Sequence, residues 1–157
     1  MIEPVTKPPN RPLVLAVTGT NGKTSVATAT RQLMSDIGWR VAGYDSTGIT
    51  DVDGVLHMAR VRKSRSYLPE MIEFQARRGA YAMSVEAFVG MLGAGLYADV
   101  EVDTAVCTGL ESDHLDVHGS LEQYWEAKLA LFRTHLRPDG VAVMAVDCAQ
   151  GDRVAAA

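Results

Sequence analysis

A short glycine-containing segment, Gly19–Ser25 (GTNGKTS), constrains the fold of this chain more than any other sequence feature. It follows the apolar run Leu13–Val17, which is typical of a strand buried on both faces of a parallel sheet. After it, apolar residues recur at helical spacing from Val26 to Ile37, and Gly38 is placed to end that helix. The segment therefore predicts a strand, a tight loop and a helix in succession.

This order of elements is the context in which a glycine-rich loop binds phosphate. The glycines let backbone N–H groups approach phosphate oxygens, and the helix N-terminus adds unpaired donors. Lys23 can reach the β- and γ-phosphates of ATP, and the Thr24 hydroxyl can bind Mg²⁺. The nucleotide-binding residues expected from this pattern are Gly19, Thr20, Asn21, Gly22, Lys23, Thr24 and Ser25.

The alternative interpretation of the segment is a glycine-rich turn with a solvated lysine. The Gly-Lys-Thr sequence lies in register between a strand and a helix, which favours nucleotide binding over that alternative. The general pattern GxxxxGK[ST] has a glycine where this chain has Val17, so the loop is a shortened variant.

Beyond this unit, short apolar runs alternate with amphipathic stretches, which is typical of an α/β domain. Asp53-Gly54 within Ile49–Val61 predicts a small β-hairpin. The expected fold is a three-layer α/β P-loop domain with a mainly parallel sheet and this hairpin as an insertion. Further strands are expected at Val41–Tyr44, Tyr81–Val85, Thr104–Thr108 and Val141–Val146, and helices at Pro69–Arg78 and Leu121–His135. Residues 1–12 are expected to form an extended linker, and residues 13–157 one domain that is truncated at its C-terminal end.

Composition narrows the function classes. The formal charge is −4, from 15 basic and 19 acidic residues, so no basic excess is present to bind nucleic acid. No apolar run approaches the roughly 20 residues of a membrane helix. Cys107 and Cys148 lie in apolar runs without a zinc-binding pattern and are expected to be buried and reduced. We expect a cytoplasmic protein.

Two further residues are predicted to lie beside the glycine-rich loop. Glu86 follows the apolar run Tyr81–Val85, and His114 follows the expected strand Thr104–Thr108. Ligands of open parallel sheets collect at the carboxyl ends of the strands, where this loop also lies. A carboxylate, an imidazole and the Thr24 hydroxyl beside a triphosphate suit Mg²⁺. Taken singly, a residue such as Glu86 is more often a solvated strand end, and one such as His114 a loop or capping residue. Only their convergence with the loop favours metal binding.

Lys128 is the one charged residue in the middle of an apolar helical stripe. The stripe consists of Leu121, Tyr124, Trp125, Leu131 and Phe132. A lysine in this position commonly buries its stem and extends its amine to solvent. The alternative is an amine that points into the site, where desolvation lowers its pKa and lets the neutral form react with CO₂.

Two motifs resemble those of the Mur ligase superfamily, which includes the peptidoglycan stem-peptide ligases. The first is Val17–Ser25 (VTGTNGKTS), which is similar to the ATP loop of that family. The second is Ala105–Gly119 (AVCTGLESDHLDVHG) with the following Tyr124–Phe132 (YWEAKLALF), which resembles the family's DHLD-x-HG block and its lysine helix. The nearest branch is the one that adds the third residue of the stem peptide.

This resemblance implies the ATP-binding central domain of an ATP-dependent carboxylate–amine ligase. It implies metal binding by Thr24, Glu86, His114 and Lys128, with one or two Mg²⁺ ions and a carbamylated Lys128. Lys23, His114 and Lys128 are the implied catalytic residues. The implied substrates are ATP and a carboxylate-bearing small molecule or peptide precursor, which is activated as an acyl phosphate for attack by an amine.

The sequence also departs from the family. The Thr-Thr-Pro segment of the stem-peptide ligases is replaced by Ser66–Glu70 (SYLPE), and their Ser-Ser-His by Ala87–Gly90 (AFVG). The stretch Glu86–Leu96 is instead similar to a loop of cyanophycin synthetase. Because family ligases also have substrate and C-terminal domains, we expect the isolated chain to need a partner domain or chain for ligation. A noncatalytic nucleotide-binding module remains an alternative, whereas no NKxD motif of a GTPase is present.

Overall fold

The structure is a computed structural model that describes residues 11–58, 64–110, 121–145 and 151–157. Seven strands form one sheet in the order β4-β3-β2-β5-β1-β6-β7. The strands are β1 (Leu13–Thr18), β2 (Val41–Asp45), β3 (Gly48–Thr50), β4 (Leu56–His57), β5 (Ala82–Glu86), β6 (Val102–Cys107) and β7 (Leu136–Met144). Five neighbouring strands pair in parallel, in the order β2, β5, β1, β6 and β7. At the β2 edge, β3 pairs antiparallel with β2, and β4 pairs antiparallel with β3.

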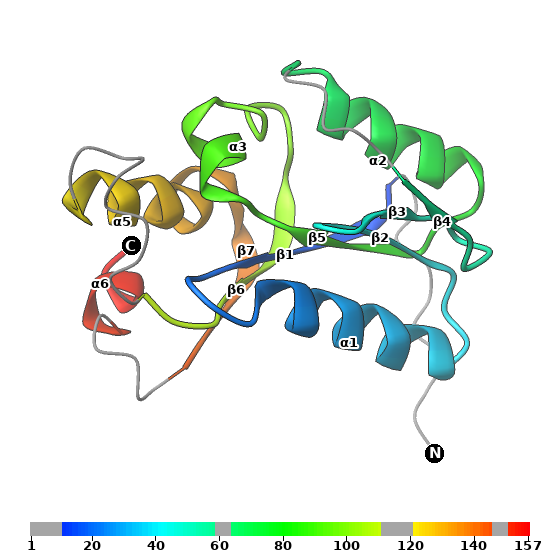
Figure 1. Cartoon of the computed structure of the whole chain (residues 1–157), viewed down its shortest axis with the longest axis horizontal. Coiled ribbons are helices and arrows are strands. Elements are labelled where there is room, and N and C mark those ends of the chain that lie inside the picture. The colour runs from blue at the N-terminus through cyan, green and yellow to red at the C-terminus, as the bar shows by residue number, and fades with distance from the viewer. Residues whose placement is uncertain (1–10, 59–63, 111–120, 146–150) are drawn as a thin grey trace.

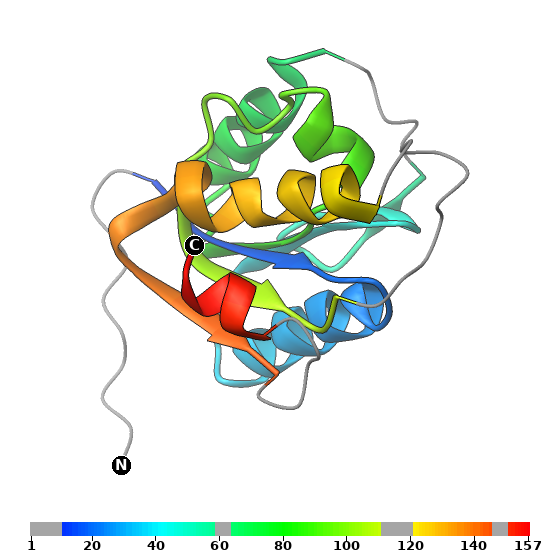
Figure 2. The ribbon, with the colours of Figure 1, turned by 90° about the vertical axis from the view of Figure 1, so that its left-hand side faces the viewer.

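Helices cover both faces of this sheet. They are α1 (Lys23–Asp36), α2 (Tyr67–Arg77), α3 (Val89–Gly93), α5 (Leu121–Ala130) with the π-helical turn η1 (Leu131–His135), and α6 (Gly151–Ala155). Helix α1 lies on one face, and α2, α3 and α5 lie on the other (Figures 1 and 2). The three-layer, mainly parallel α/β architecture predicted from the sequence is confirmed.

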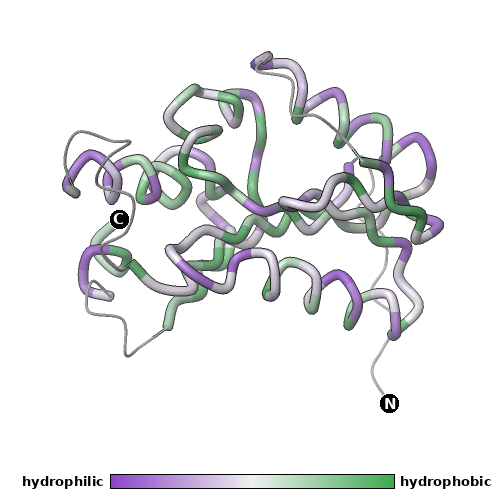
Figure 3. The backbone as a smooth tube through the Cα atoms, in the orientation of Figure 1, coloured by the Kyte–Doolittle hydropathy of each residue, from purple (hydrophilic) through white to green (hydrophobic). Residues whose placement is uncertain are grey.

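The core lies between the central strands and the α2–α3–α5 layer. Val14 and Ala16 of β1 are at most 2% exposed, and Val17, whose side chain points to the opposite face, is fully buried, as expected for a parallel strand covered on both faces. Figure 3 shows the most hydrophobic segments gathered in these central strands. The apolar runs of the central strands therefore fill the core, whereas Val141 and Val143 of the edge strand β7 are 55% and 44% exposed.

Several predicted boundaries need correction. The predicted helix Leu121–His135 is α-helical only to Ala130, after which the last turn is π-helical. The last strand spans Leu136–Met144, so it starts earlier than the predicted Val141. Helix α3 lies in the stretch Glu86–Leu96, which the sequence analysis interpreted as a loop. The predicted hairpin is present and extends the main sheet through β3 and β4.

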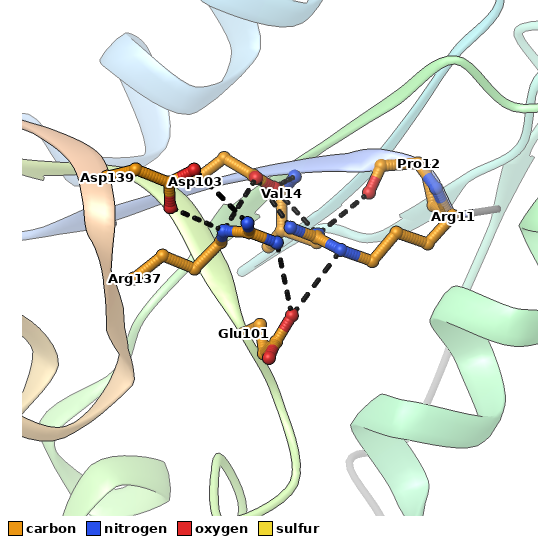
Figure 4. Close-up of polar contacts among 7 residues, drawn as sticks. All are labelled: Arg11, Pro12, Val14, Glu101, Asp103, Arg137 and Asp139. Carbon is orange, nitrogen blue, oxygen red and sulfur yellow. Dashed lines mark hydrogen bonds and ion pairs between the residues drawn. The ribbon is translucent and has the colours of Figure 1, made fainter. Parts of the chain in front are cut away.

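An ionic cluster fixes the start of β1. Arg11 donates two hydrogen bonds to the Asp103 carboxylate at 2.8 and 2.6 Å, and the same carboxylate accepts from Val14 N at 2.8 Å (Figure 4). Glu101 lies between Arg11 and Arg137 and forms an ion pair with each. The described end of the predicted linker is thus tied to β6, whereas residues 1–10 lie outside the described residues. The cluster lies at the amino end of β1, opposite the glycine-rich loop.

Candidate functional site

The glycine-rich loop has the backbone geometry that its sequence requires. Gly22 has φ +79° and directly precedes α1, and Gly19 has φ +142°. A Cβ on Gly19 would lie 2.0 Å from Thr108 Oγ1, far inside van der Waals contact. Only glycine fits this position without displacing its neighbours.

The end of β6 holds the loop in place. Thr20 N donates to Gly109 O at 2.8 Å, and Thr108 N donates to Thr18 O at 3.0 Å. The Thr108 hydroxyl also donates to Asn21 O at 2.5 Å. Thr108 was not among the predicted site residues, although it belongs to the second motif. Its position at the carboxyl end of an expected strand, where ligands of parallel sheets collect, is the signal that could have identified it.

Lys23, Thr24 and Glu86 meet at the carboxyl end of the central strands. The β1–β5 register pairs Val17 with Glu86, so the glutamate stands beside the start of the loop. The Thr24 hydroxyl donates to Glu86 Oε2 at 2.6 Å, and Lys23 Nζ lies 3.9 Å from Glu86 Oε1. Lys23 Nζ also donates to Thr20 O at 3.0 Å. The Glu86 side chain is only 3% exposed, and a buried charge is costly unless it is paired. The contacts with Thr24 and Lys23 compensate this charge.

The hydroxyl of Thr24 and the carboxylate of Glu86 are hard oxygen donors, which fit a divalent cation such as Mg²⁺. Across residues 11–58, 64–110, 121–145 and 151–157, no cluster of three His, Cys, Asp or Glu side chains with metal-binding geometry occurs. The predicted ligand His114 lies outside the described residues. The described part of the site therefore offers two oxygen donors next to the phosphate loop, and phosphate oxygens and water would complete a Mg²⁺ shell.

Lys128 reaches the loop from α5. Its side chain is 2% exposed, and its amine donates to Thr20 Oγ1 at 3.2 Å and to Tyr124 OH at 2.5 Å. The amine also lies 3.8 Å from the centroid of the Tyr124 ring, in cation–π geometry. The lysine does not extend to solvent, so the alternative based on a solvated amine is wrong.

The remaining predicted loop residues differ in exposure. Thr20 is 8% exposed and contacts Lys128, whereas Asn21, Gly22 and Ser25 face solvent. Exposed backbone at Asn21 and Gly22 is what a phosphate-binding loop requires, because the ligand approaches from solvent.

The buried phenols of Tyr44 and Tyr97 interact electrostatically with the Glu86 carboxylate. Burial chiefly, followed by the nearby charges of Tyr67 and Glu86, raises the pKa of Tyr44 to about 12. Burial also raises the pKa of Tyr97, with Tyr44 and Glu86 as smaller causes. Both hydroxyls are buried without a hydrogen-bond partner. These phenols therefore stay protonated at neutral pH and add no charge to the site.

The parallel sheet and the loop after its central strand define a P-loop α/β protein. The sequence model of the Mur ligase middle domain matches residues 17–157. The chain therefore belongs to the Mur ligase family and corresponds to its middle domain.

Relatives of known identity agree with this assignment. A UDP-N-acetylmuramoyl-L-alanyl-D-glutamate–2,6-diaminopimelate ligase of Zymomonas mobilis is 35% identical over 148 residues, covering 88% of this chain and 29% of that protein. A solved structure of a ligase with the same name has a TM-score of 0.76 and 33% identity, covering 93% of this chain and 29% of that one.

A more distant ligase shares the fold at low sequence identity. The MurF ligase of Thermotoga maritima, solved in complex with ADP, has a TM-score of 0.69 and 21% identity, covering 93% of this chain and 31% of that one. The chain thus spans under a third of the length of these relatives. Within the described residues, no helix combines the length and apolar character needed to cross a membrane.

Proposed function

We propose that this chain is the ATP-binding core of an ATP-dependent carboxylate–amine ligase. The observation that carries the proposal is the meeting of Lys23, Thr24 and Glu86 beside the glycine-rich loop, with the Thr24 hydroxyl 2.6 Å from the Glu86 carboxylate. The distant MurF relative was solved in complex with ADP, which supports nucleotide binding by a protein of this fold.

The reaction begins with transfer of the γ-phosphoryl group of ATP to a carboxylate oxygen. The bond to the β-phosphate oxygen breaks, ADP leaves, and an acyl phosphate forms. An amine then attacks the acyl carbon, phosphate departs, and the amine loses a proton to give the amide. The loop N–H groups orient the phosphates, and Lys23 compensates their charge. Thr24 and Glu86 would hold a Mg²⁺ ion, which would supply further charge neutralisation.

Lys128 serves this site as a carbamate. Its neutral amine attacks CO₂, a C–N bond forms, and the nitrogen releases a proton to water. The product carries a carboxylate in place of a cation, and carboxylate oxygens are ligands that Mg²⁺ prefers. Support comes from the burial of Lys128 and from its contact with Thr20 in the phosphate loop. His114 is the proposed companion ligand.

The substrate is a carboxylate-bearing small molecule or peptide precursor. The ligases named above, of which this chain spans 29%, join UDP-N-acetylmuramoyl-L-alanyl-D-glutamate to 2,6-diaminopimelate by name. The replacement of Thr-Thr-Pro by the Ser66–Glu70 sequence leaves the carboxylate as the only substrate feature that we assign. A further domain or partner chain in the cytoplasm would supply the amine-binding part.

Isothermal calorimetry with Mg-ATP tests the nucleotide site. The wild-type chain is expected to give a binding heat that Lys23→Ala abolishes, because the substitution removes the cation that faces the phosphates. The control is Arg77→Ala, which removes an exposed cation from α2 that pairs with Glu73. Unchanged binding by a folded Lys23→Ala chain would refute the proposal.

The carbamate is tested by ¹³C NMR in ¹³C-bicarbonate with Mg²⁺ present. A carbamate resonance is expected in the wild-type chain and not in Lys128→Met, which keeps the volume of the side chain. A wild-type spectrum without this resonance would remove the carbamate from the proposal and leave nucleotide binding intact.

A further inference from the structure

The turn between β2 and β3, residues Asp45–Thr47, lies directly beside Thr24 and Glu86. The backbone N–H of Ser46 donates to Glu86 Oε2 at 3.2 Å. The Ser46 hydroxyl oxygen lies 3.2 Å from Thr24 Oγ1. Neither sequence motif includes this turn, so the contacts assign it to the site for the first time.

The direction of these hydrogen bonds follows from counting protons. The Glu86 carboxylate can only accept, so the single Thr24 hydroxyl proton is engaged with Glu86 Oε2. The Ser46 hydroxyl must therefore be the donor to Thr24 Oγ1. Ser46 thus contacts both members of the pair, through its hydroxyl at Thr24 and through its backbone at Glu86.

This closed ring leaves specific oxygens for a ligand. Glu86 Oε2 already accepts two hydrogen bonds, whereas Oε1 faces Lys23 at 3.9 Å. One lone pair of Thr24 Oγ1 accepts from Ser46, and the second is left for a cation. The ring therefore leaves Glu86 Oε1 and one lone pair of Thr24 Oγ1 outside its hydrogen bonds.

The Asp45 carboxylate fixes the turn by hydrogen bonds within the turn and to α1. Asp45 Oδ1 accepts from the backbone N–H of Thr47 at 2.8 Å, which closes an Asx turn. Asp45 Oδ2 accepts from the Thr28 hydroxyl at 3.3 Å, and Thr28 lies on α1. Helix α1 is the helix that the phosphate loop opens, so the turn and the loop share one rigid support.

We propose that Ser46 is a positioning residue for the divalent cation, and that it holds the Thr24 hydroxyl and the Glu86 carboxylate in the orientation that the cation requires. This inference rests on the proposed function. Mg²⁺ demands near-octahedral geometry at short metal–oxygen distances, so small rotations of either ligand weaken its binding. Residues that orient metal ligands have large effects on metal affinity without touching the ion.

The test measures cation and nucleotide binding separately. Mn²⁺ affinity is determined by electron paramagnetic resonance in the presence of ATP, and ATP affinity by calorimetry in EDTA. Ser46→Ala, which keeps the backbone N–H, is expected to weaken Mn²⁺ binding roughly tenfold. Its affinity for ATP in EDTA is expected to equal that of the wild type, because the serine does not hold the nucleotide.

Two further variants complete the design. Ser46→Thr keeps the hydroxyl and is expected to restore Mn²⁺ affinity. Ser64→Ala is the matched control, because the hydroxyl of this exposed serine is hydrogen-bonded to the Ser66 hydroxyl and not to Thr24 or Glu86.

Two outcomes overturn the role of Ser46. One is an unchanged Mn²⁺ affinity in Ser46→Ala, and the other is an equal loss of ATP affinity in EDTA, which would indicate a general distortion of the loop. A wild-type chain that binds neither ATP nor Mn²⁺ would instead reject the proposed function together with this inference.

Discussion

At the residue scale, Gly19 is the position of the phosphate loop that tolerates the least change. Gly19→Ala is expected to destabilise the chain by about 1–3 kcal/mol, because φ +142° is strained for alanine and the new Cβ would overlap Thr108 Oγ1. Gly90→Ala is the control, since a Cβ there meets no atom within 4 Å. Urea unfolding measures both variants, and equal stabilities would contradict the geometry of the loop.

The buried Tyr44 phenol affects the stability of the folded chain at high pH. Its pKa is about 12 in the folded chain and about 10 when unfolded, so between these values the folded state holds a proton that the unfolded state has released. Stability from this group is complete below pH 10 and is lost as the pH rises toward 12. Tyr44→Phe is expected to flatten that loss and to leave the chain at least as stable at pH 7, because the buried hydroxyl has no partner.

Denaturation series between pH 7 and pH 11.5 provide the measurement. Tyr81→Phe is the control, since the Tyr81 side chain is partly exposed and Tyr81 is not among the groups that raise the pKa of Tyr44. A Tyr44→Phe chain that loses stability above pH 10 as steeply as the wild type would contradict the assigned pKa.

Individual site residues differed in how far the sequence could reveal them. Lys128 was identifiable because a charge in the middle of an apolar stripe is a local anomaly that periodicity exposes. Ser46 was not, because a serine in a turn is common and its role arises from the pairing of β2 with β5, which places Ser46 and Glu86 together. Contacts across a sheet depend on register, and no local pattern carries that information.

At the scale of elements, the β3–β4 hairpin depends on one buried carboxylate. Asp51 accepts from the backbone N–H groups of Asp53 and Val55 at 3.0 Å each and contacts His57 Nε2 at 2.8 Å. Arg78 lies 3.3 Å away. The hydrogen bond from His57 chiefly holds the pKa of Asp51 below its usual 3.8.

Asp51→Ala is expected to cost about 1–3 kcal/mol, because several donors lose their acceptor. Since the pKa is lowered by folding, this stability is present above pH 4 and is lost as the pH falls through the folded pKa. Hydrogen exchange of the hairpin amides measures the effect, with Glu73→Ala in an exposed pair on α2 as the control. Hairpin amides that exchange equally slowly in both variants would show that Asp51 does not hold this element.

Element boundaries were predictable where turn chemistry is local. Asp53-Gly54 correctly predicted the hairpin, and Gly38 follows Ile37, the C-cap residue of α1. The π-helical turn after Ala130 and the start of β7 at Leu136 were not predictable. Both depend on how the end of α5 packs against the sheet, which is a tertiary effect that overrides propensity.

At the scale of the whole molecule, strand order determines which motifs meet. Strand β1 lies between β5 and β6, so the phosphate loop after β1 is flanked by Glu86 on one side and by Thr108 on the other. The meeting of the loop with Glu86 was predictable, because parallel strands bring their carboxyl ends to one edge. The order of strands within the sheet was not, since it depends on long-range pairing.

Binding and ligation should separate in the 157-residue polypeptide. It contains the loop, Lys23 and Glu86 that we propose to hold Mg-ATP, yet it spans only 29% of the length of the diaminopimelate ligases that it resembles. Delivering an amine to an acyl phosphate requires both reactants to be held at reacting distance, which is a large part of the rate acceleration in such transfers. We therefore expect the purified polypeptide to bind Mg-ATP but to form no amide product from UDP-muramoyl peptides.

Mass spectrometry of the reaction, with a full-length diaminopimelate ligase as the positive control, measures this outcome. Product formation that depends on Lys23 would demonstrate that the middle domain alone positions both substrates.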